Sequence, residues 1–510
     1  MSIGVVGGGA AAVCLIDALA RVRNTVGSLT VFEPSPHLWR GRAYQVDTDT
    51  LRVNATPDDM SVRAGDPGHF ERWLETRDRL TGITDGTDPL SGARFVSRRC
   101  YGDYLEHCAR TALGTLRRTG RRVTLVREPV TSARRLPRRV RLHTRARSHT
   151  FDYVVLSVGG GSPQDTYGLS GTPGFVADPY PVSAALRDIG EDEHVAVVGS
   201  GLSAVDVVLS LAARGHRGRI SMLSRQGVLP GVRQKPVRLH LRHLTPDRLR
   251  RTARTHRELT VADIATAVRA EFRDAGADLD AVLEEIARAA REDPVDRLRR
   301  QLDEVDSPHL GLRILQRAVP QTGPDVWPLL READKIRLLR AHHRTLMSLC
   351  CPMPPAGATV LLNLVQAGQL AMFCGLHGIT PAGQGGFDVR ADGTGLHTDR
   401  VINAVNACEG RIPAAARGLV TSLINDRAAS RHTHGGLQLA RATSRLTYNG
   451  RPDPRLYGLG NIAAGALFFT FGIPSLVDRS QDIVTAIHEH AATVTAAHRE
   501  ARPRTHPLPA

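Results

Sequence analysis

The chain has 510 residues, more than one hydrophobic core usually organises, so the sequence predicts at least two domains. With 41% hydrophobic residues it has the composition of a globular protein, and no apolar stretch reaches the roughly 18 residues of a membrane span. The formal charge of +16 comes from arginines spread along the chain, since only Lys235 and Lys335 are lysine, and aromatic residues make up only 4%; we therefore expect no nucleic-acid partner.

The N-terminus, the cysteines and the C-terminus carry further expectations. The first residues enter a strand pattern at once, without the basic segment and cleavage site of a secretory signal. The seven cysteines are odd in number and scattered, with no CxxC spacing, so neither a disulfide framework nor a redox dithiol is indicated. We therefore expect a cytoplasmic protein with reduced thiols. Residues 496–510 are expected to form a flexible tail.

The first informative segment has the pattern of a dinucleotide-binding unit. An apolar run at 3–6 meets a turn at 7–12 whose residues follow GxGxxA. A helical stretch over 13–21 and a second strand over 28–33 follow. The order strand, turn, helix, strand is the one that such a unit requires.

The residues of this turn have distinct expected roles. Gly7 permits the sharp bend, Gly9 lets the backbone approach a pyrophosphate, and Ala12 lets helix and strand pack closely. The N-terminus of the helix then presents free N–H groups to the anion. Glu33, at the end of the second strand, is placed to bind a ribose 2′-hydroxyl. The alternative is a glycine-rich turn that binds nothing.

A second unit repeats this arrangement nearly 200 residues later. Its strand is expected at 194–198, its helix at 205–213 and its next strand at 219–225. The turn between strand and helix contains Gly199, Gly201 and Ser203, which are expected to contact a second nucleotide.

The two units differ at the end of their second strand. The second unit has Ser224-Arg225 where the first has Glu33. Glutamate repels a 2′-phosphate, whereas serine and arginine bind one. The sequence therefore predicts FAD in the first unit and NADPH in the second. The alternative is that Arg225 is one more surface arginine in an arginine-rich chain.

Each unit is followed by a polar, turn-rich segment that ends in an apolar run, at 152–156 and at 399–403. Each predicts a β-meander that returns the chain to a parallel sheet. Residues 245–347 show helical spacing and predict a helical insertion. The sequence thus predicts an α/β fold with two Rossmann-like dinucleotide-binding domains, in which an FAD domain (1–178 and 381–495) is interrupted by an NADPH domain (179–380).

Several further segments carry a pattern found in one group of flavoproteins. They are Gly41 with Ala43-Tyr44, Leu51 with Asn54, Pro57 and Met60-Ser61, Phe95 to Arg98 with Tyr101 to Leu105, Asp178 to Tyr180 with the turn up to Asp206, Tyr457 to Asn461, and Phe471 to Ser475. On these residues the chain resembles FAD- and NAD(P)-binding proteins related to class B flavin monooxygenases, among them the amino-acid N-hydroxylases and nitrosuccinate synthases.

The resemblance implies where the flavin binds. The loop with Tyr44, Asn54, Met60 and Ser61 lies close to the isoalloxazine ring in such proteins, so the last three are candidate catalytic residues, and Arg98 is implied to be a flavin-side arginine. The closing motif, with Gly460, Asn461 and Pro474, is implied to bring a helix N-terminus against the flavin, where its dipole favours negative charge on the reduced ring.

The chain departs from the family pattern at three points. Many relatives have Ala-Thr-Gly after each returning strand, whereas this chain has Ser157-Val158-Gly159 and Ala407-Cys408-Glu409-Gly410. Asn461 also replaces the usual aspartate of the last FAD turn. These changes keep the FAD assignment and weaken the assignment to one hydroxylase subfamily.

Flavin chemistry explains why no nucleophile is evident. Reduced flavin either reacts with O2 to form a C4a-hydroperoxide or delivers hydride to an organic acceptor, and neither route needs covalent work by a side chain. Ser203 and Ser224 lack the partners of a catalytic triad. The adjacent His342 and His343 fit a helical face, so no catalytic metal is expected.

The segment 230–243 is rich in basic residues, among them Arg233, Lys235 and Arg238. One interpretation is a solvated loop. The other is a cationic lip that guides NADPH or binds a substrate carboxylate, for which arginine is the usual ligand. The resemblance to nitrosuccinate synthases indicates an acidic amino acid such as aspartate.

Together these features predict an FAD-dependent, NADPH-using monooxygenase that acts through a C4a-(hydro)peroxyflavin and N-oxygenates a small, aspartate-like amino acid with O2. Two alternatives are an NADPH-linked flavin reductase or dehydrogenase without oxygen insertion, and a non-catalytic flavoprotein. The sequence leaves the substrate, the number of oxidation steps and homo-oligomer formation open.

Overall fold

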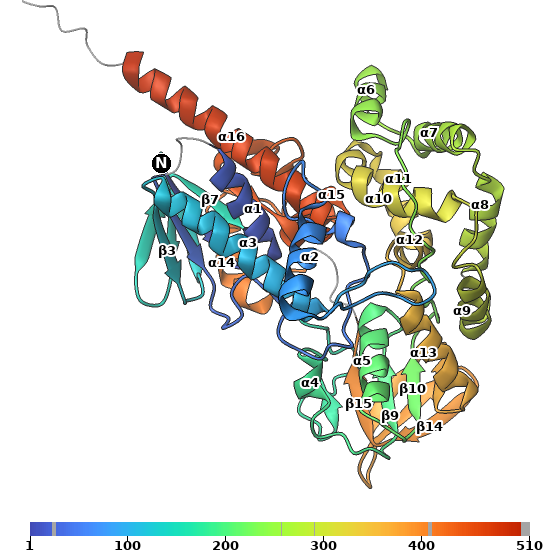
Figure 1. Cartoon of the computed structure of the whole chain (residues 1–510). Helices are drawn as coiled ribbons and strands as arrows, with labels where there is room; N and C mark the ends of the chain where they lie inside the picture. Colours follow the sequence, from blue (N-terminus) through green and yellow to red (C-terminus); the bar gives the residue numbers. More distant parts are fainter. Residues whose placement is uncertain (23–26, 257, 290, 406–410, 501–510) are drawn as a thin grey trace, which may run out of the picture.

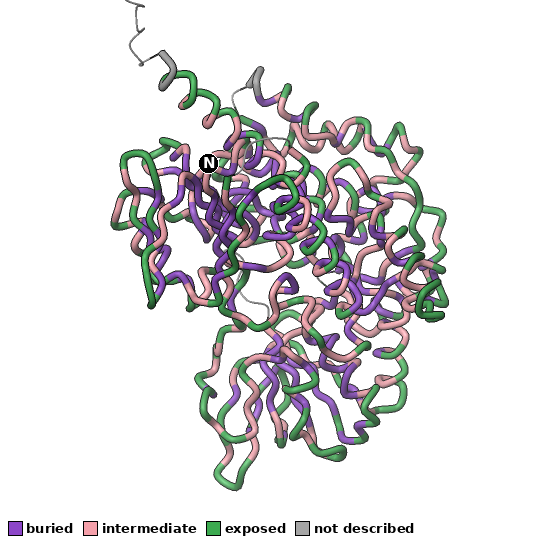
Figure 2. Tube along the Cα trace, turned by 60° about the vertical axis from the view of Figure 1, so that its left-hand side comes forward, coloured by how far each residue is buried: buried purple, intermediate pink, exposed green. Residues whose placement is uncertain are grey.

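A computed structural model describes residues 1–22, 27–256, 258–289, 291–405 and 411–500. Figure 1 shows two α/β domains, with a helical insertion beside them. The buried residues concentrate in the two sheets and the helices on them (Figure 2). Among the residues that the structure describes, no helix has the length and apolar character of a membrane span. The two α/β domains and the helical insertion confirm the predicted fold class.

The first domain is built on a seven-stranded sheet in the order β16-β17-β18-β7-β1-β2-β3. β1 lies in the sheet interior and pairs in parallel with both β2 and β7. The strands are β1 Ser2–Val6, β2 Ser28–Phe32, β3 Arg122–Val126, β7 Tyr153–Leu156, β16 Leu439–Ala440, β17 Arg445–Tyr448 and β18 Arg451–Gly458.

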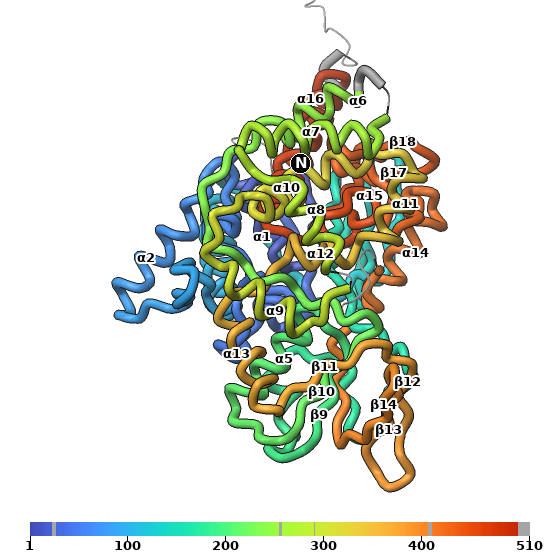
Figure 3. The backbone as a smooth tube through the Cα atoms, turned by 90° about the vertical axis from the view of Figure 1, so that its right-hand side faces the viewer, coloured from blue at the N-terminus to red at the C-terminus, as the bar shows by residue number. Residues whose placement is uncertain are grey.

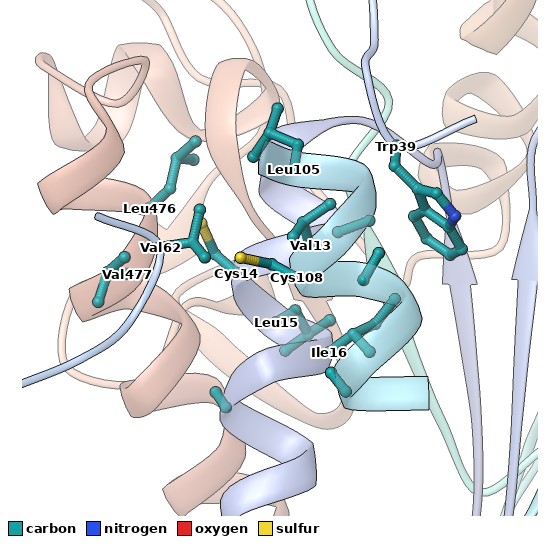
Figure 4. Packing of buried hydrophobic residues seen from close by; sticks show 14 of the residues in the cluster. Val13, Cys14, Leu15, Ile16, Trp39, Val62, Leu105, Cys108, Leu476 and Val477 are labelled. Carbon is teal, nitrogen blue, oxygen red and sulfur yellow. The ribbon is translucent and has the colours of Figure 1, made fainter. Parts of the chain in front are cut away.

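Three helices cover one face of this sheet: α1 (Ala10–Arg21), α3 (Arg98–Arg118) and α16 (Ile473–Glu500). Figure 4 shows their apolar side chains meeting, with Cys14 of α1, Cys108 of α3 and Val477 of α16 in one cluster. α16 continues to residue 500, so the predicted tail from 496 is wrong for its first residues. Residues 501–510 lie outside the described part of the chain.

The other face of the first sheet is covered by the predicted β-meander and a helix. The meander and the helix share an apolar cluster with Phe32 and Val126. These elements are β4 Ser132–Arg135, β5 Val140–His143, β6 Ser148–Phe151 and α14 Arg417–Asn425. Shorter elements complete the domain, namely η1 Pro57–Asp59, α2 His69–Thr81, η3 Ala414–Ala416, η4 Gly460–Ala463 and α15 Ala464–Leu467.

The second domain has a five-stranded parallel sheet in the order β11-β10-β9-β15-β8. The helices α5 and α13 pack on one face, and the second predicted meander, β12 to β14, packs on the other. The elements are β8 Phe175–Val176, α4 Val182–Ala185, β9 Val195–Val198, α5 Leu202–Ala213, β10 Ile220–Leu223, α13 Pro355–Gln366, β11 Leu370–Phe373, β12 Gly378–Pro381, β13 Phe387–Ala391, β14 Thr394–Thr398 and β15 Arg400–Asn403.

Both predicted domain boundaries are wrong. β15 pairs with β9 and β8, so residues 381–403 belong to the second domain rather than to the first. β8 also lies before the predicted start at 179. The reason is that each meander returns the chain to the sheet that it left, so β15 stands beside β9 as β7 stands beside β1.

The predicted helical insertion is confirmed. It lies between β10 and α13 and packs against the C-terminal part of the first domain, as Figure 3 shows from the side. The indole Nε1 of Trp327 donates a hydrogen bond to the carbonyl of Gly465 over 3.0 Å, and its ring stacks on Phe468. The helices are α6 Pro246–His256, α7 Val261–Asp274, α8 Leu279–Arg288, α9 Pro294–Asp303, α10 Gly311–Val326, η2 Trp327–Leu329, α11 Glu332–Ala341 and α12 His343–Cys350.

Candidate functional site

The first glycine turn has the geometry that phosphate binding needs. Gly7 has a φ of +103°, and a Cβ there would lie 2.1 Å from the carbonyl oxygen of Ser157, so no other residue fits. A Cβ on Gly9 would lie 3.3 Å from the Cα of Gly41. Ala12 is fully buried. α1 begins at Ala10 without a side-chain cap, so its first N–H groups are available to an anion.

Glu33 lies at the end of β2 as predicted, and it also shapes the turn. Its carboxylate accepts hydrogen bonds from the backbone N–H groups of Gly8 and Ser35, over 2.7 and 2.8 Å. Because a carboxylate offers about four acceptor positions, capacity remains for ribose hydroxyls. Glu33 therefore has a structural role in the turn, and its binding of a ribose stays a prediction.

The second turn repeats the backbone geometry of the first at its opening glycine. The N–H of Gly199 donates to the carbonyl of Leu223, as that of Gly7 donates to Phe32. Gly199 has a φ of +123°, and a Cβ there would lie 2.8 Å from a backbone oxygen. α5 follows Gly201, again without a side-chain cap. Ser203, in the first turn of α5, hydrogen-bonds the Tyr180 hydroxyl.

The residues after β10 present positive charge at the second turn. Arg225 is exposed and forms no ion pair with any residue that the structure describes. Arg344 of α12 lies close enough to Arg225 for their charges to interact. Partial burial, and after it the charge of Arg225, lower the pKa of Arg344. The Ser224 hydroxyl accepts a hydrogen bond from the N–H of Gly227 over 2.7 Å and so shapes the loop. Cations without an anionic partner suit a phosphate.

The loop predicted to lie beside the flavin is held by tyrosines. Tyr44 packs edge-on against Tyr101, and burial raises its pKa to about 12. The Tyr101 hydroxyl donates to the carbonyl of Met60, and the Ser61 hydroxyl donates to that of Asp66. Asn54 is half-buried. These bonds give Met60 and Ser61 a part in holding the loop, and the catalytic roles of Asn54, Met60 and Ser61 stay predictions.

Arg98 is turned toward the second domain. Its guanidinium pairs with Asp206 of α5 over 2.7 Å and donates to the Tyr180 hydroxyl over 3.2 Å, and its Nε donates to the backbone carbonyl of Arg52. The interpretation of Arg98 as a flavin-side residue gains no support from these contacts. Sequence reasoning did not predict Asp206 as the partner of Arg98. The signal that could have indicated it is a single acidic residue among the apolar residues of α5.

The closing motif brings polar groups to the start of α16. Gly460 has a φ of +79°, and the Asn461 side-chain amide donates to the carbonyls of Gly159 and Arg411. Pro474 is exposed in the first turn of α16. On either side of this turn, the hydroxyls of Thr470 and Ser475 are buried and have no hydrogen-bond partner within the described part of the chain. Such hydroxyls fit the polar edge of a flavin. Residues 407–410, the altered turn, lie outside the described residues.

The predicted cationic lip does not form as a unit. Lys235 is exposed and pairs with the still more exposed Asp306 on the surface, and Arg238 is also exposed. Arg233 is half-buried instead, and its backbone N–H donates to the carbonyl of Met353. Its buried Nε has no partner among the described residues, and burial lowers its pKa while Asp59 of the first domain opposes the shift. Arg233 is therefore the inward cation of the segment.

No group of three His, Cys, Asp or Glu side chains that could hold a metal occurs in the described ranges. His342 and His343 do not share one helical face, because α11 ends before His342 and α12 begins at His343. The His343 ring meets Phe468 edge-on.

Comparisons with known proteins agree with this geometry. Residues 4–161 match the FAD-NAD(P)-binding family. No curated protein sequence matches significantly. Among solved structures, the ornithine hydroxylase of Pseudomonas aeruginosa has a TM-score of 0.59 at 16% identity, covering 96% of this chain and 99% of that one.

Two further solved structures share the fold. The FAD-bound cadaverine monooxygenase of Erwinia amylovora gives a TM-score of 0.61 at 12% identity, covering 96% and 94% of the two chains. An ornithine N-hydroxylase of Kutzneria, with reduced FAD, NADP+ and L-ornithine, gives 0.56 at 17%, covering 96% and 99%. Residues 4–161 thus match an FAD-NAD(P)-binding domain, and the chain as a whole shares the fold of these three solved structures.

Proposed function

We propose that the protein is an FAD-dependent, NADPH-using monooxygenase that N-oxygenates a small amino acid. The observation that carries the proposal is the pair of equivalent glycine turns, one followed by Glu33 and the other by Ser224 and Arg225. A protein that binds one dinucleotide without a ribose 2′-phosphate and one with it would hold FAD and NADP(H), the pair of cofactors found in the Kutzneria enzyme of the same fold.

In the first domain, the N-terminus of α1 would bind the FAD pyrophosphate and Glu33 the ribose. A Cβ on Gly9 would make a tight contact with Gly41, so a larger side chain there would crowd the turn. The buried hydroxyls of Thr470 and Ser475, which have no partner among the described residues, would bind polar atoms of the flavin ring together with the N-terminus of α16. Bound FAD would supply the redox chemistry by taking electrons from NADPH and passing them to O2.

In the second domain, the N-terminus of α5 would bind the NADPH pyrophosphate. Arg225 would hold the 2′-phosphate, and the nearby charge of Arg344 would add to its attraction. The helical insertion packs on both domains, with Trp327 stacked on Phe468 of the first and Leu298 in a cluster with Leu361 of the second. This packing would exclude water from the reacting groups, which peroxide chemistry requires.

The substrate would bind near Arg233, whose positive charge interacts with the negative charge of Asp59. An inward guanidinium with a partnerless Nε fits a carboxylate, and a nearby carboxylate fits an ammonium group. An amino acid carries both groups. Asp59 also pairs with Arg317 over 3.2 Å, so cations gather here and favour an acidic amino acid such as aspartate.

Mass spectrometry of products formed under 18O2 tests the proposal. The purified protein would be incubated with FAD, NADPH and, in separate reactions, aspartate, ornithine and lysine. We expect an amino-acid product that carries oxygen from O2. Oxidation of NADPH that yields only hydrogen peroxide, or that needs a quinone acceptor, would instead indicate a flavin reductase.

A further inference from the structure

A set of polar contacts joins the flavin loop of the first domain to the second domain. Arg42 pairs with Asp178 over 2.5 Å. The carboxylate of Asp47 accepts hydrogen bonds from the backbone at the start of α4, over 2.7 and 2.8 Å. The hydroxyls of Thr50 and Ser210 lie 3.1 Å apart. The segment that is predicted to approach the flavin therefore also contacts the other nucleotide domain.

The centre of these contacts is a buried charge cluster. The side chains of Arg98 and Asp206 are only 16% and 8% exposed. The Tyr180 hydroxyl donates to Asp206 and accepts from Arg98, and guanidinium groups of Arg42 and Arg98 lie 5.2 and 5.8 Å from its ring centroid. All the charged groups of the cluster are satisfied only when both domains are in this arrangement.

Such a cluster fixes orientation more than it adds stability. A buried ion pair contributes little net free energy of folding, whereas leaving one of its charges buried and alone is costly. Any rotation of the second domain that separates α5 from α3 would have that cost. Asp206 lies only five residues after Gly201, so the cluster acts on the helix that would receive the NADPH pyrophosphate.

We propose that Arg98, Asp206 and Tyr180 form an interdomain latch that holds the second domain where its nucleotide reaches the flavin loop. The inference rests on the proposed function for the identity of the nucleotides, while the latch itself rests on the contacts among these three side chains. Arg98 and Asp206 are positioning residues in this latch. The competing assignment is that Arg98 binds the flavin directly.

Two single variants separate these assignments. Asp206→Asn and Arg98→Lys would each be loaded with FAD, and the rate of flavin reduction by NADPH would be measured by stopped flow. The latch predicts that both variants retain FAD and that both slow reduction about ten- to hundredfold, the cost of a displacement near 1 Å, while reduction by dithionite is unchanged. Loss of FAD in Arg98→Lys alone would overturn the latch in favour of flavin binding.

A milder variant and a matched control guard against misfolding. Arg42→Gln removes an interdomain ion pair, and Arg139→Gln removes another partly exposed pair, Arg139–Asp152, which lies within the first domain and takes no part in these contacts. We expect Arg42→Gln to slow reduction by NADPH by about two- to fivefold, as for a partly exposed pair, and Arg139→Gln to leave it unchanged. Equal effects of the two variants would overturn the latch.

Hydrogen exchange tests the latch without either cofactor reaction. In the protein free of NADPH, the amides of residues 182–186 should exchange faster in Asp206→Asn and Arg42→Gln than in Arg139→Gln. Unchanged exchange together with unchanged reduction would overturn the latch. If the unaltered protein is not reduced by NADPH at all, the proposed function fails, and the exchange experiment still decides on the latch.

Discussion

The two glycine turns share a backbone conformation and differ in the residue that ends the next strand. In both, a glycine N–H bonds to the end of that strand, and the third parallel strand places a carbonyl where a side chain would clash. Glu33 turns inward and bonds to the first turn, whereas Arg225 is exposed without an ion partner in the described structure. Under the proposed function, the shared backbone would provide the phosphate site, and the residue at the strand end would select the sugar.

The largest expected effects come from variants that disrupt one glycine turn and leave the other intact. Gly9→Val would place methyl groups against Gly41 and in the path of the pyrophosphate, so we expect the purified protein to lose its FAD completely. Gly201→Val should abolish reduction by NADPH and leave FAD bound. Flavin absorbance and an NADPH titration measure the two effects.

The control for these variants is Gly383→Val, since a Cβ there meets nothing within 4 Å. This variant should retain its bound FAD and should still be reduced by NADPH. A yellow Gly9→Val protein would show that the first turn does not bind FAD.

The next effect sharpens the contrast at the strand ends. Arg225→Ala should raise the KM for NADPH, and not that for NADH, by roughly ten- to over a hundredfold, because a hydrogen bond to a charged group contributes about 1.5–3 kcal/mol. Steady-state kinetics with both nucleotides measure it. Arg238→Ala, an exposed arginine nearby in the chain, is the control. An equal rise for both nucleotides would contradict a 2′-phosphate contact.

A third variant tests whether Arg233, the inward cation, binds the substrate or NADPH. Arg233→Gln should raise the KM for the amino acid by at least about tenfold, for the same reason, with the KM for NADPH unchanged. Lys235→Gln, which alters an exposed surface pair, should change neither constant. A selective rise in the KM for NADPH would assign Arg233 to the nucleotide instead.

The smallest expected effect concerns the first strand end. Glu33→Gln keeps an acceptor for the bond to Gly8 and loses the charge, so we expect FAD affinity to fall by about two- to tenfold, the value of an ordinary hydrogen bond. Fluorescence titration of the apoprotein with FAD measures it. Tighter binding of FAD to this variant would contradict the ribose contact.

Local sequence patterns predicted most of the secondary structure and its order. They did not predict the features that depend on pairing between distant segments. Both turns, both meanders and the insertion follow from spacing, because strand and helix periods are local properties. The domain boundary was wrong since the pairing of β15 with β9 is decided across two hundred residues. The partner of Arg98 and the outward turn of Lys235 depend on packing between distant segments, which no local pattern encodes.

The most direct test of the two-nucleotide assignment is a crystal structure of the protein with FAD and NADP+. We expect the FAD pyrophosphate at the 7–12 turn and the 2′-phosphate of NADP+ beside Ser224 and Arg225. A nucleotide at only one of the two turns, or a 2′-phosphate directed away from Arg225, would contradict it.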